Sequence, residues 1–287
     1  MNSVNMLTLG VDGYPSGLEN ITSPPRHLYW QGTDPKEWLG RPKVAIVGSR
    51  KMTAYGQAVT TDLARQLAAA GVVIISGLAF GVDITAHKAA LAAGGLTVAV
   101  IATGLDNITP RSNYQIAQEI VRTGTILSEQ PFGKPVNLGL FVIRNRIISG
   151  LADIVLIPEA VLKSGSLHTA RFALEQGKTV MAVPGNINSP ASQGSNNLIK
   201  SGAIPVTSAD DVLFALNINP ATTNKSQASF NSRQERIVFD LIQKGVRQQD
   251  DIAIAAGMDI TSISAALTML EISGHIRPAG AGNWLTA

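Results

Sequence analysis

Val44-Ala45-Ile46-Val47-Gly48-Ser49-Arg50 is the stretch of sequence that decides the fold. An apolar run leads directly into a glycine turn, and stretches 72–77, 98–104, 154–166 and 180–185 repeat the arrangement. Runs that are apolar at nearly every position are typical of strands buried on both faces of a parallel sheet. The sequence therefore predicts a parallel sheet that helices cover on both faces.

The glycine turns follow the carboxyl ends of these strands, where open parallel sheets bind their ligands. At the first turn, Gly48 allows close approach to the backbone, Ser49 adds a hydroxyl and Arg50 a fixed positive charge. Such groups favour a ligand that carries phosphate.

Residues 43–216 alternate between predicted strands and helices. The predicted strands are 44–48, 72–76, 97–102, 125–128, 153–158, 179–183 and 203–207. The predicted helices are 55–70, 83–93, 113–122, 141–151, 166–176 and 209–216. This series predicts a doubly wound, mostly parallel Rossmann-like α/β domain with right-handed crossovers. We expect left-handed C-terminal caps at four glycines, Gly71, Gly94, Gly124 and Gly177.

Three segments flank this domain. Residues 1–42 carry proline, glycine and aromatic residues, and we expect a lead-in segment that packs on the main domain. Residues 217–232 are polar and aperiodic, which predicts a linker. Residues 233–287 predict three short helices and a β-ribbon, the pattern of a small C-terminal winged helix.

Composition excludes several classes of protein. The 287 residues include no cysteine and four scattered histidines, so we predict no disulfide and no metal site. The apolar runs are too short for a membrane span and the first residues lack a signal-peptide pattern, so we expect a cytoplasmic protein. The net charge is +3, and residues 233–287 contain five basic and six acidic residues. A polyanion should therefore prefer the larger domain.

Arg50 is the first candidate binding residue. The dinucleotide fingerprint G-x-G-x-x-G is absent, because Arg50 and Thr53 stand where glycines would be needed, and no G-x-x-x-x-G-K-[ST] loop occurs. An ordinary NAD or NTP enzyme is disfavoured, and no cofactor is predicted. Arg50 can pair with a phosphate or stack on a base; alternatively it holds a neighbouring loop.

A second group of candidates, Phe141, Arg144, Asn145 and Arg146, opens the predicted helix 141–151. Phe141 and Arg144 are three residues apart and share a helix face, whereas Arg146 points elsewhere. An aromatic ring beside arginine is typical of sites that stack the bases and hold the phosphates of single strands. The alternative is a core phenylalanine with two arginines in structural ion pairs.

Two further turns add candidates. Lys163-Ser164-Gly165-Ser166 opens a helix with Thr169 in its first turn, and its backbone N–H groups suit an anion unless a serine is simply the N-cap. Gly77 begins the turn after the second strand, and Asp83 and His87 follow it. No nucleophile accompanies this pair, so we expect helix capping and packing from them and no catalytic residue.

The predicted recognition helix of the winged helix, residues 261–273, contains one glutamate and no lysine or arginine. A helix that reads a DNA groove normally needs cations for phosphates and base edges. We therefore expect this module to contact protein.

Together these motifs resemble the DNA-processing protein A (DprA/Smf) family over nearly the whole chain. They are VAIVGSR (44–50), SGLAFGVDITAH (76–87), GLDNITPRSN (104–113), LSEQPFG (127–133), FVIRNRIISGLAD (141–153), KSGSLHTA (163–170) and PGNINSPASQGSNNLI (184–199). Each motif alone is weak, and their combination is specific. The sequence departs from the family at Thr109, where tyrosine is usual, at Val142, where proline is usual, and at His168, where an aliphatic residue is common.

The resemblance implies a non-enzymatic protein that binds single-stranded DNA and delivers it to a RecA-type recombinase during DNA uptake, competence and natural transformation. It also implies a homodimer. By motif, the single-strand pocket of the family falls on Ser49, Arg50, Phe141, Arg144, Asn145, Lys163, Ser164, Gly165 and Ser166.

Two other functions remain open. Nucleotide-cleaving hydrolases of the lysine-decarboxylase-like type share the broad fold, but their P-G-G-x-G-T-x-x-E motif is reduced here to Pro184-Gly185-Asn186. A regulator of duplex DNA that acts through the winged helix is disfavoured by the uncharged helix 261–273.

Overall fold

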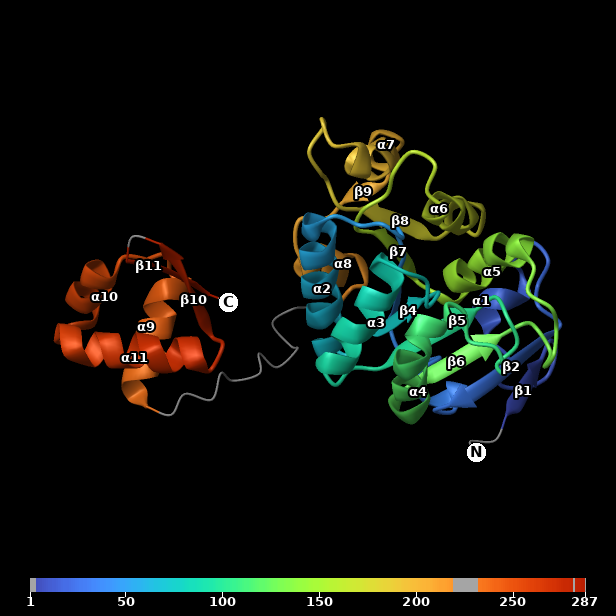
Figure 1. Ribbon diagram of the computed structural model, residues 1–287, viewed down its shortest axis with the longest axis horizontal. Helices are drawn as coiled ribbons and strands as arrows, with labels where there is room; N and C mark the ends of the chain where they lie inside the picture. Colours follow the sequence, from blue (N-terminus) through green and yellow to red (C-terminus); the bar gives the residue numbers. More distant parts are fainter. Residues whose placement is uncertain (1–3, 219–231, 281, 287) are drawn as a thin grey trace. The chain divides into compact units, whose positions relative to one another are not determined.

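The computed structural model describes residues 4–218, 232–280 and 282–286, and the chain divides into two compact units, Met1–Thr223 and Asn224–Ala287. In its described residues the larger unit has a nine-stranded sheet with helices on both faces (Figure 1). The smaller unit has helices and a two-stranded sheet.

Seven strands form the parallel part of the large sheet. They are β3 (Lys43–Ile46), β4 (Val73–Ser76), β5 (Thr97–Ile101), β6 (Thr125–Ser128), β7 (Ile154–Ile157), β8 (Thr179–Ala182) and β9 (Ile204–Pro205). Their spatial order is β6-β5-β4-β3-β7-β8-β9, so β3 starts the series in the middle and the order reverses between β3 and β7. The predicted mostly parallel α/β fold is confirmed, and β3–β7 is its topological switch point.

Helices cross between the strands, and all but one were predicted. They are α2 (Ala54–Ala69), α3 (Val82–Ala92), α4 (Tyr114–Thr123), α5 (Leu138–Leu151), α6 (Ser166–Glu175), α7 (Gln193–Lys200) and α8 (Ala209–Ala215). α5 begins about one turn before the predicted Phe141, because Asn137 caps it by accepting a hydrogen bond from Gly139 N at 2.8 Å. α7 was missed because its sequence, QGSNNLIK, is mostly polar and rich in turn residues.

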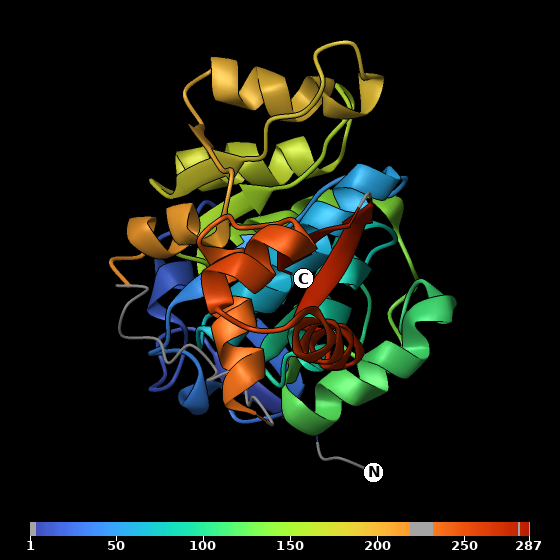
Figure 2. The ribbon, with the colours of Figure 1, turned by 90° about the vertical axis from the view of Figure 1, so that its left-hand side faces the viewer.

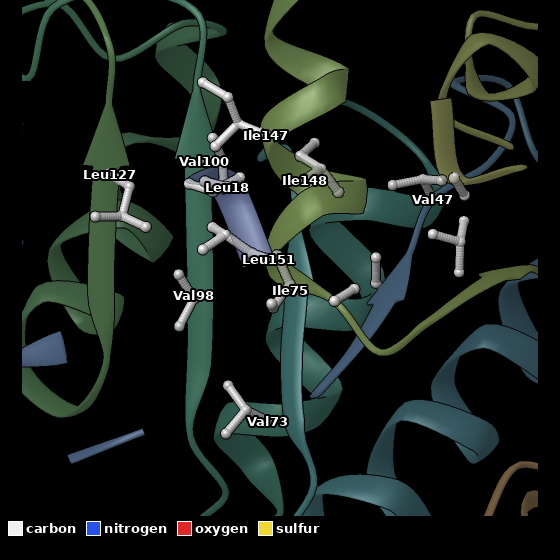
Figure 3. Close-up of a cluster of buried hydrophobic side chains, with 14 of the residues drawn as sticks. Leu18, Val47, Val73, Ile75, Val98, Val100, Leu127, Ile147, Ile148 and Leu151 are labelled. Carbon is white, nitrogen blue, oxygen red and sulfur yellow. The ribbon is translucent and has the colours of Figure 1, made fainter. Parts of the chain in front are cut away.

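Two apolar layers form because successive strand residues point to opposite faces of the sheet. On one face, Val73 and Ile75 of β4 belong to the same buried cluster as Ile147 and Leu151 of α5, with Ile75 beside Leu151 (Figure 3). On the other face Ile74, the residue between them, packs with α2 and α3. The burial of α5 against the sheet fixes where its first turn, and with it Phe141, emerges at the carboxyl edge.

The lead-in segment joins the sheet as two strands, β1 (Asn5–Thr8) and β2 (His27–Gly32). β2 pairs antiparallel with β6, Tyr29 opposite Ser128. Between and after these strands lie α1 (Ser16–Glu19) and a short 3₁₀ turn, Pro35–Glu37. These two strands were not predicted, because aromatic and turn residues in the segment interrupt the alternation of apolar and polar residues that indicates a strand.

Gly71, Gly94 and Gly177 adopt the expected left-handed conformation, with φ of +83°, +68° and +67°. The prediction for Gly124 was wrong: its φ is −145°, which is extended backbone. β6 begins at the next residue, and a Cβ at Gly124 would collide with the carbonyl oxygen of Thr97. Gly124 is therefore required for a close approach between two backbone segments of the chain and not for a cap.

The smaller unit contains α9 (Arg233–Gln243), α10 (Gln249–Ala256), α11 (Ile260–Ile272) and an antiparallel ribbon of β10 (Ile276–Gly280) and β11 (Asn283–Thr286). Figure 2 shows the ribbon beside α11, in agreement with contacts between β10 and α11. Val238, Ile252 and Leu270 lie in its own apolar core. The expected winged-helix pattern is confirmed.

Within the described parts of the chain, no single helix is long and apolar enough to cross a membrane. Only α10 and α11 taken together, bent by 113°, reach that length and apolarity.

Candidate nucleic-acid interface

A cleft of about 490 Å³ opens at the carboxyl edge of the sheet, between the ends of β3 and β7. The turn after β3, the first turns of α5 and the loop from β7 to α6 form its walls. All the predicted binding residues line this cleft except Gly77 and Arg146. Those that line it are Ser49, Arg50, Phe141, Arg144, Asn145, Lys163, Ser164, Gly165, Ser166 and Thr169.

The turn after β3 is held by Glu159 in the loop that follows β7. Ser49 N donates to the carbonyl oxygen of Glu159 at 2.8 Å, and the buried Glu159 carboxylate accepts from Thr53 N at 2.9 Å. Gly48 has no room for a side chain, since a Cβ would come within 2.7 Å of the same carbonyl oxygen. The two loops are thereby tied together at the switch point, and Arg50 at the end of the turn is exposed.

Arg50 and Phe141 meet across the cleft. The guanidinium carbon of Arg50 lies 6.0 Å from the centroid of the Phe141 ring, within the range of a cation–π contact. Phe141 is partly exposed and Arg50 is exposed. The cleft therefore offers an aromatic face and a planar cation, both of which can stack on a base.

Arg144 lies in the cleft wall but is only 6% exposed. Nη1 of Arg144 donates to the carbonyl oxygen of Gly77, at 2.8 Å, and to the carbonyl oxygen of Val100. Nε of Arg144 donates to Asn145 Oδ1 at 3.2 Å. Its guanidinium thus ties α5 to the ends of β4 and β5. A Cβ on Gly77 would lie 2.6 Å from Nη2 of Arg144 and 2.7 Å from Oδ2 of Asp83, so a side chain here would displace these two buried groups.

Asp83 holds the same turn from the other side. Its Oδ2 accepts a hydrogen bond from Gly77 N at 3.1 Å. Burial raises the pKa of Asp83, and the nearby Arg144 opposes this rise. Burial lowers the pKa of Arg144 to about 10, and Asp83 opposes that change, so the guanidinium stays charged at neutral pH. The expected capping role of Asp83 was wrong: α3 begins at Val82, and no side chain caps it.

His87 packs in the core, as expected, and is fully buried. Thr97 Oγ1 donates to the carbonyl oxygen of Ile74 at 2.7 Å, so it must accept its 2.7 Å bond from His87 Nδ1. Nδ1 therefore carries a proton, and Nε2 has no hydrogen-bond partner among the described residues. Burial lowers the pKa of His87 to about 3.

The loop from β7 to α6 forms the opposite wall. Lys163 is exposed, and the hydroxyls of Ser164 and Ser166 are 2.8 Å apart. α6 has Gly165 at its N-cap position, and its first N–H groups are already engaged. Ser166 N donates to Ser164 Oγ at 3.4 Å, and Leu167 N donates to the Ser164 carbonyl oxygen at 3.1 Å. Asn145 Nδ2 donates to the Gly165 carbonyl oxygen at 3.4 Å and links the loop to α5.

Arg146 points away from the cleft, as its helical position predicted, and forms an ion pair with Glu129 at 2.6 Å. The alternative of a structural ion pair therefore holds for this residue. Sequence reasoning missed Lys51, which is exposed and lines the cleft. Its position next to Arg50 in the strand-to-helix turn was the signal that could have found it.

No three histidine or acidic side chains cluster as a metal ion would require within residues 4–218, 232–280 and 282–286. The charged groups at the cleft are instead the exposed cations Arg50, Lys51 and Lys163 and the buried pair of Asp83 and Arg144. An anionic ligand with planar, apolar parts fits this combination.

The fold and the cleft define a doubly wound α/β protein with a cationic, aromatic-lined cleft at its switch point, followed by a winged helix. The chain belongs to the DNA recombination-mediator protein A family, whose model matches residues 5–217. The model of the DprA winged helix domain matches residues 220–282. The resemblance seen in the sequence is thereby confirmed.

Relatives and solved structures agree. Protein Smf of Escherichia coli K12 is 38% identical over 278 residues, 94% of this chain and 74% of that protein. DNA processing protein DprA of Bacillus subtilis is 41% identical over 213 residues, 74% of this chain and 71% of that protein. The X-ray structure of DNA processing protein A from Streptococcus pneumoniae is 40% identical with a TM-score of 0.69 over 73% of each chain.

A structure of DNA processing protein A from Helicobacter pylori, which concerns the single-stranded DNA binding mode of that protein, has a TM-score of 0.68. It is 36% identical and covers 76% of this chain and 98% of the other.

Proposed function

We propose that the cleft binds single-stranded DNA and that the protein is a non-enzymatic recombination mediator. The observation that carries the proposal is the partly exposed Phe141 ring with the Arg50 guanidinium 6.0 Å from its centroid. Any of the four bases can stack on such a ring, and exposed cations neutralise the adjoining phosphates. The single-strand binding of the Helicobacter pylori relative supports the same ligand for this chain.

The cleft residues divide by exposure into two roles. Arg50, Lys51 and Lys163 are exposed and contact phosphates, and the hydroxyl groups of Ser164 and Ser166 lie beside them in the cleft wall. Arg144 is buried and shapes the cleft by holding the Gly77 turn. Arg146 acts further away, by fixing α5 to Glu129.

Single strands suit this cleft better than duplexes, because only an unpaired base can lay its face on a ring inside it. The winged helix offers no competing duplex site, since α11 carries no lysine or arginine. A nucleotide-cleaving hydrolase is not favoured, because Asp83 and Glu159 both hold backbone N–H groups in place.

The family to which the chain belongs supports delivery of the bound strand to a RecA-type recombinase in the cytoplasm during DNA uptake and transformation. We further propose that the chain forms a homodimer, as the sequence resemblance implies. Light scattering gives the mass in solution. The rate at which RecA nucleates on single strands coated with single-strand-binding protein, with and without this chain, tests delivery.

The deciding experiment is fluorescence anisotropy with labelled single- and double-stranded oligonucleotides of one sequence, together with incubation of labelled mononucleotides. We expect tight binding of the single strand, weak binding of the duplex and no cleavage of nucleotides. Cleavage of nucleotides without binding of the single strand would show that the protein is a nucleotide hydrolase. Preferential binding of the duplex would show that the main DNA site is in the winged helix.

A further inference from the structure

Phe80 is a large apolar side chain that remains 51% exposed beside the cleft. It belongs to the turn between β4 and α3, and it is not among the residues that line the cleft. Among the described residues, Phe80 belongs to none of the apolar core clusters of the larger unit.

The turn that carries Phe80 lies directly against Arg50. Val82 N donates to the Ser49 carbonyl oxygen at 3.2 Å. A Cβ on Gly81 would lie 2.8 Å from the backbone carbonyl carbon of Arg50. Phe80, the neighbour of Gly81, therefore lies next to the residue whose guanidinium faces Phe141.

The turn is also held rigidly in an unfavourable conformation. Leu78 has a φ of +59°, unusual for a residue with a side chain, and Gly81 has a φ of +73°. Asn113 Nδ2 donates to the Leu78 carbonyl oxygen at 2.9 Å, while Asp83 and Arg144 hold Gly77. Strain that neighbouring contacts maintain is concentrated at functional sites, and here these contacts fix the backbone of the turn that carries the exposed Phe80 ring.

We propose that Phe80 is a second stacking platform, on which a base of the strand lies after the strand leaves the cleft past Arg50. The proposal rests on the proposed single-strand function of the cleft. The strand then passes Phe141, the Arg50 guanidinium and Phe80 in that order. Alternating aromatic rings and cations along one path are what an unpaired strand requires, because its bases and phosphates alternate.

Binding of oligothymidylates of 2 to 12 nucleotides, followed by fluorescence anisotropy, tests the proposal. A strand short enough to occupy only the cleft should bind Phe80→Ala as tightly as wild type. Longer strands should bind it about 5- to 150-fold more weakly, the range for loss of one stacked base. The salt dependence should not change, since no phosphate contact is lost.

Phe132→Ala is the matched control. Phe132 is 52% exposed and lies on the same edge of the sheet, but it follows β6, three strands away from β3. This variant should bind every length like wild type. Phe80→Tyr, which keeps a stacking ring, should restore the affinity for long strands, and melting temperatures should match because Phe80 is half exposed.

Three results overturn the second platform. If Phe80→Ala binds all lengths like wild type while Phe141→Ala binds them more weakly, Phe80 has no role and the function of the cleft stands. An equal loss at every length would place Phe80 in the cleft itself. If neither Phe80→Ala nor Phe141→Ala weakens binding, both the platform and the proposed function fail.

Discussion

Arg50 and Arg144 line the same cleft, but they have different roles because they differ in solvent exposure. Arg50 is exposed, so its charge is available to a ligand, whereas Arg144 donates to two backbone carbonyl oxygens and is 6% exposed. An exposed cation acts through phosphate attraction, which salt weakens. A buried cation acts through the geometry of the groups it holds, because those groups would otherwise lack partners.

Arg50→Ala should weaken single-strand binding and lower the slope of log affinity against log salt by roughly 0.7, the loss of one phosphate contact on a single strand. Titrations at several salt concentrations measure both effects. Arg171→Ala is the control, because Arg171 is exposed on α6 outside the cleft and pairs with Glu175 at 2.8 Å. A slope equal to wild type in Arg50→Ala would show that Arg50 contacts no phosphate.

Arg144→Ala should lower the free energy of unfolding by about 3 kcal/mol, since it leaves carbonyl oxygens and the buried Asp83 without their cation. Urea unfolding measures the change. Arg65→Ala, which removes an exposed pair with Asp62 at 2.9 Å, should change it by less than about 1 kcal/mol. A stable Arg144→Ala protein with a reduced salt slope would make Arg144 a direct phosphate ligand.

His87 should make the protein less stable in mild acid. Its pKa is about 3 in the fold, below its ordinary 6.5, so the unfolded chain binds a proton that the folded chain does not. The stabilisation is complete above pH 6.5 and is lost as the pH falls toward 3. Between pH 7 and 5 the loss is about 2 kcal/mol. Urea unfolding across this range should show it in wild type, and a His87→Gln variant with the same pH dependence would assign the loss to other groups.

α5 is the element that builds the cleft, because this one helix carries both Phe141, whose ring faces Arg50, and the arginines that anchor the helix to the sheet and to Glu129. Its inner face packs on β4 and β5 through residues such as Ile147, so its first turns project from the sheet edge (Figure 3). The position of Phe141 is therefore set by core packing more than one turn further along the helix.

Phe141→Ala should weaken single-strand binding by about 1–3 kcal/mol, with little dependence on salt or on base identity. Anisotropy titrations with two homopolymers at two salt concentrations measure this. Circular dichroism and the melting temperature should stay near wild type, because the ring is partly exposed. An unfolded variant would show instead that the ring is part of the core.

Apolar runs and glycine turns were enough to predict the parallel elements, because burial on both faces leaves a signal in the sequence. They missed β1 and β2, which join the large sheet only because β2 pairs with β6, a strand nearly a hundred residues later. The chemistry of the cleft followed from residue types at strand ends. The burial of Arg144 did not, because its partners Gly77 and Val100 come from separate strands that only the fold brings together.

At the scale of the whole molecule, the two units have separate cores. Deletion of residues 217–287 should leave single-strand affinity within about tenfold of wild type, since the cleft lies wholly in the larger unit and residues 233–287 add no net positive charge. Gel shifts of the shortened chain measure this. A larger loss would place a main DNA contact in the winged helix.

The antiparallel pairing of β2 with β6 also governs the order in which the protein is assembled on the ribosome. Tyr29 lies opposite Ser128, so β2 leaves the exit tunnel long before its partner has been synthesised. β1 pairs with β2, and it therefore gains a place in the large sheet only through that late partner. β1 and β2 therefore remain outside the large sheet on the ribosome until β6, whose paired residues come nearly a hundred positions later, has been translated.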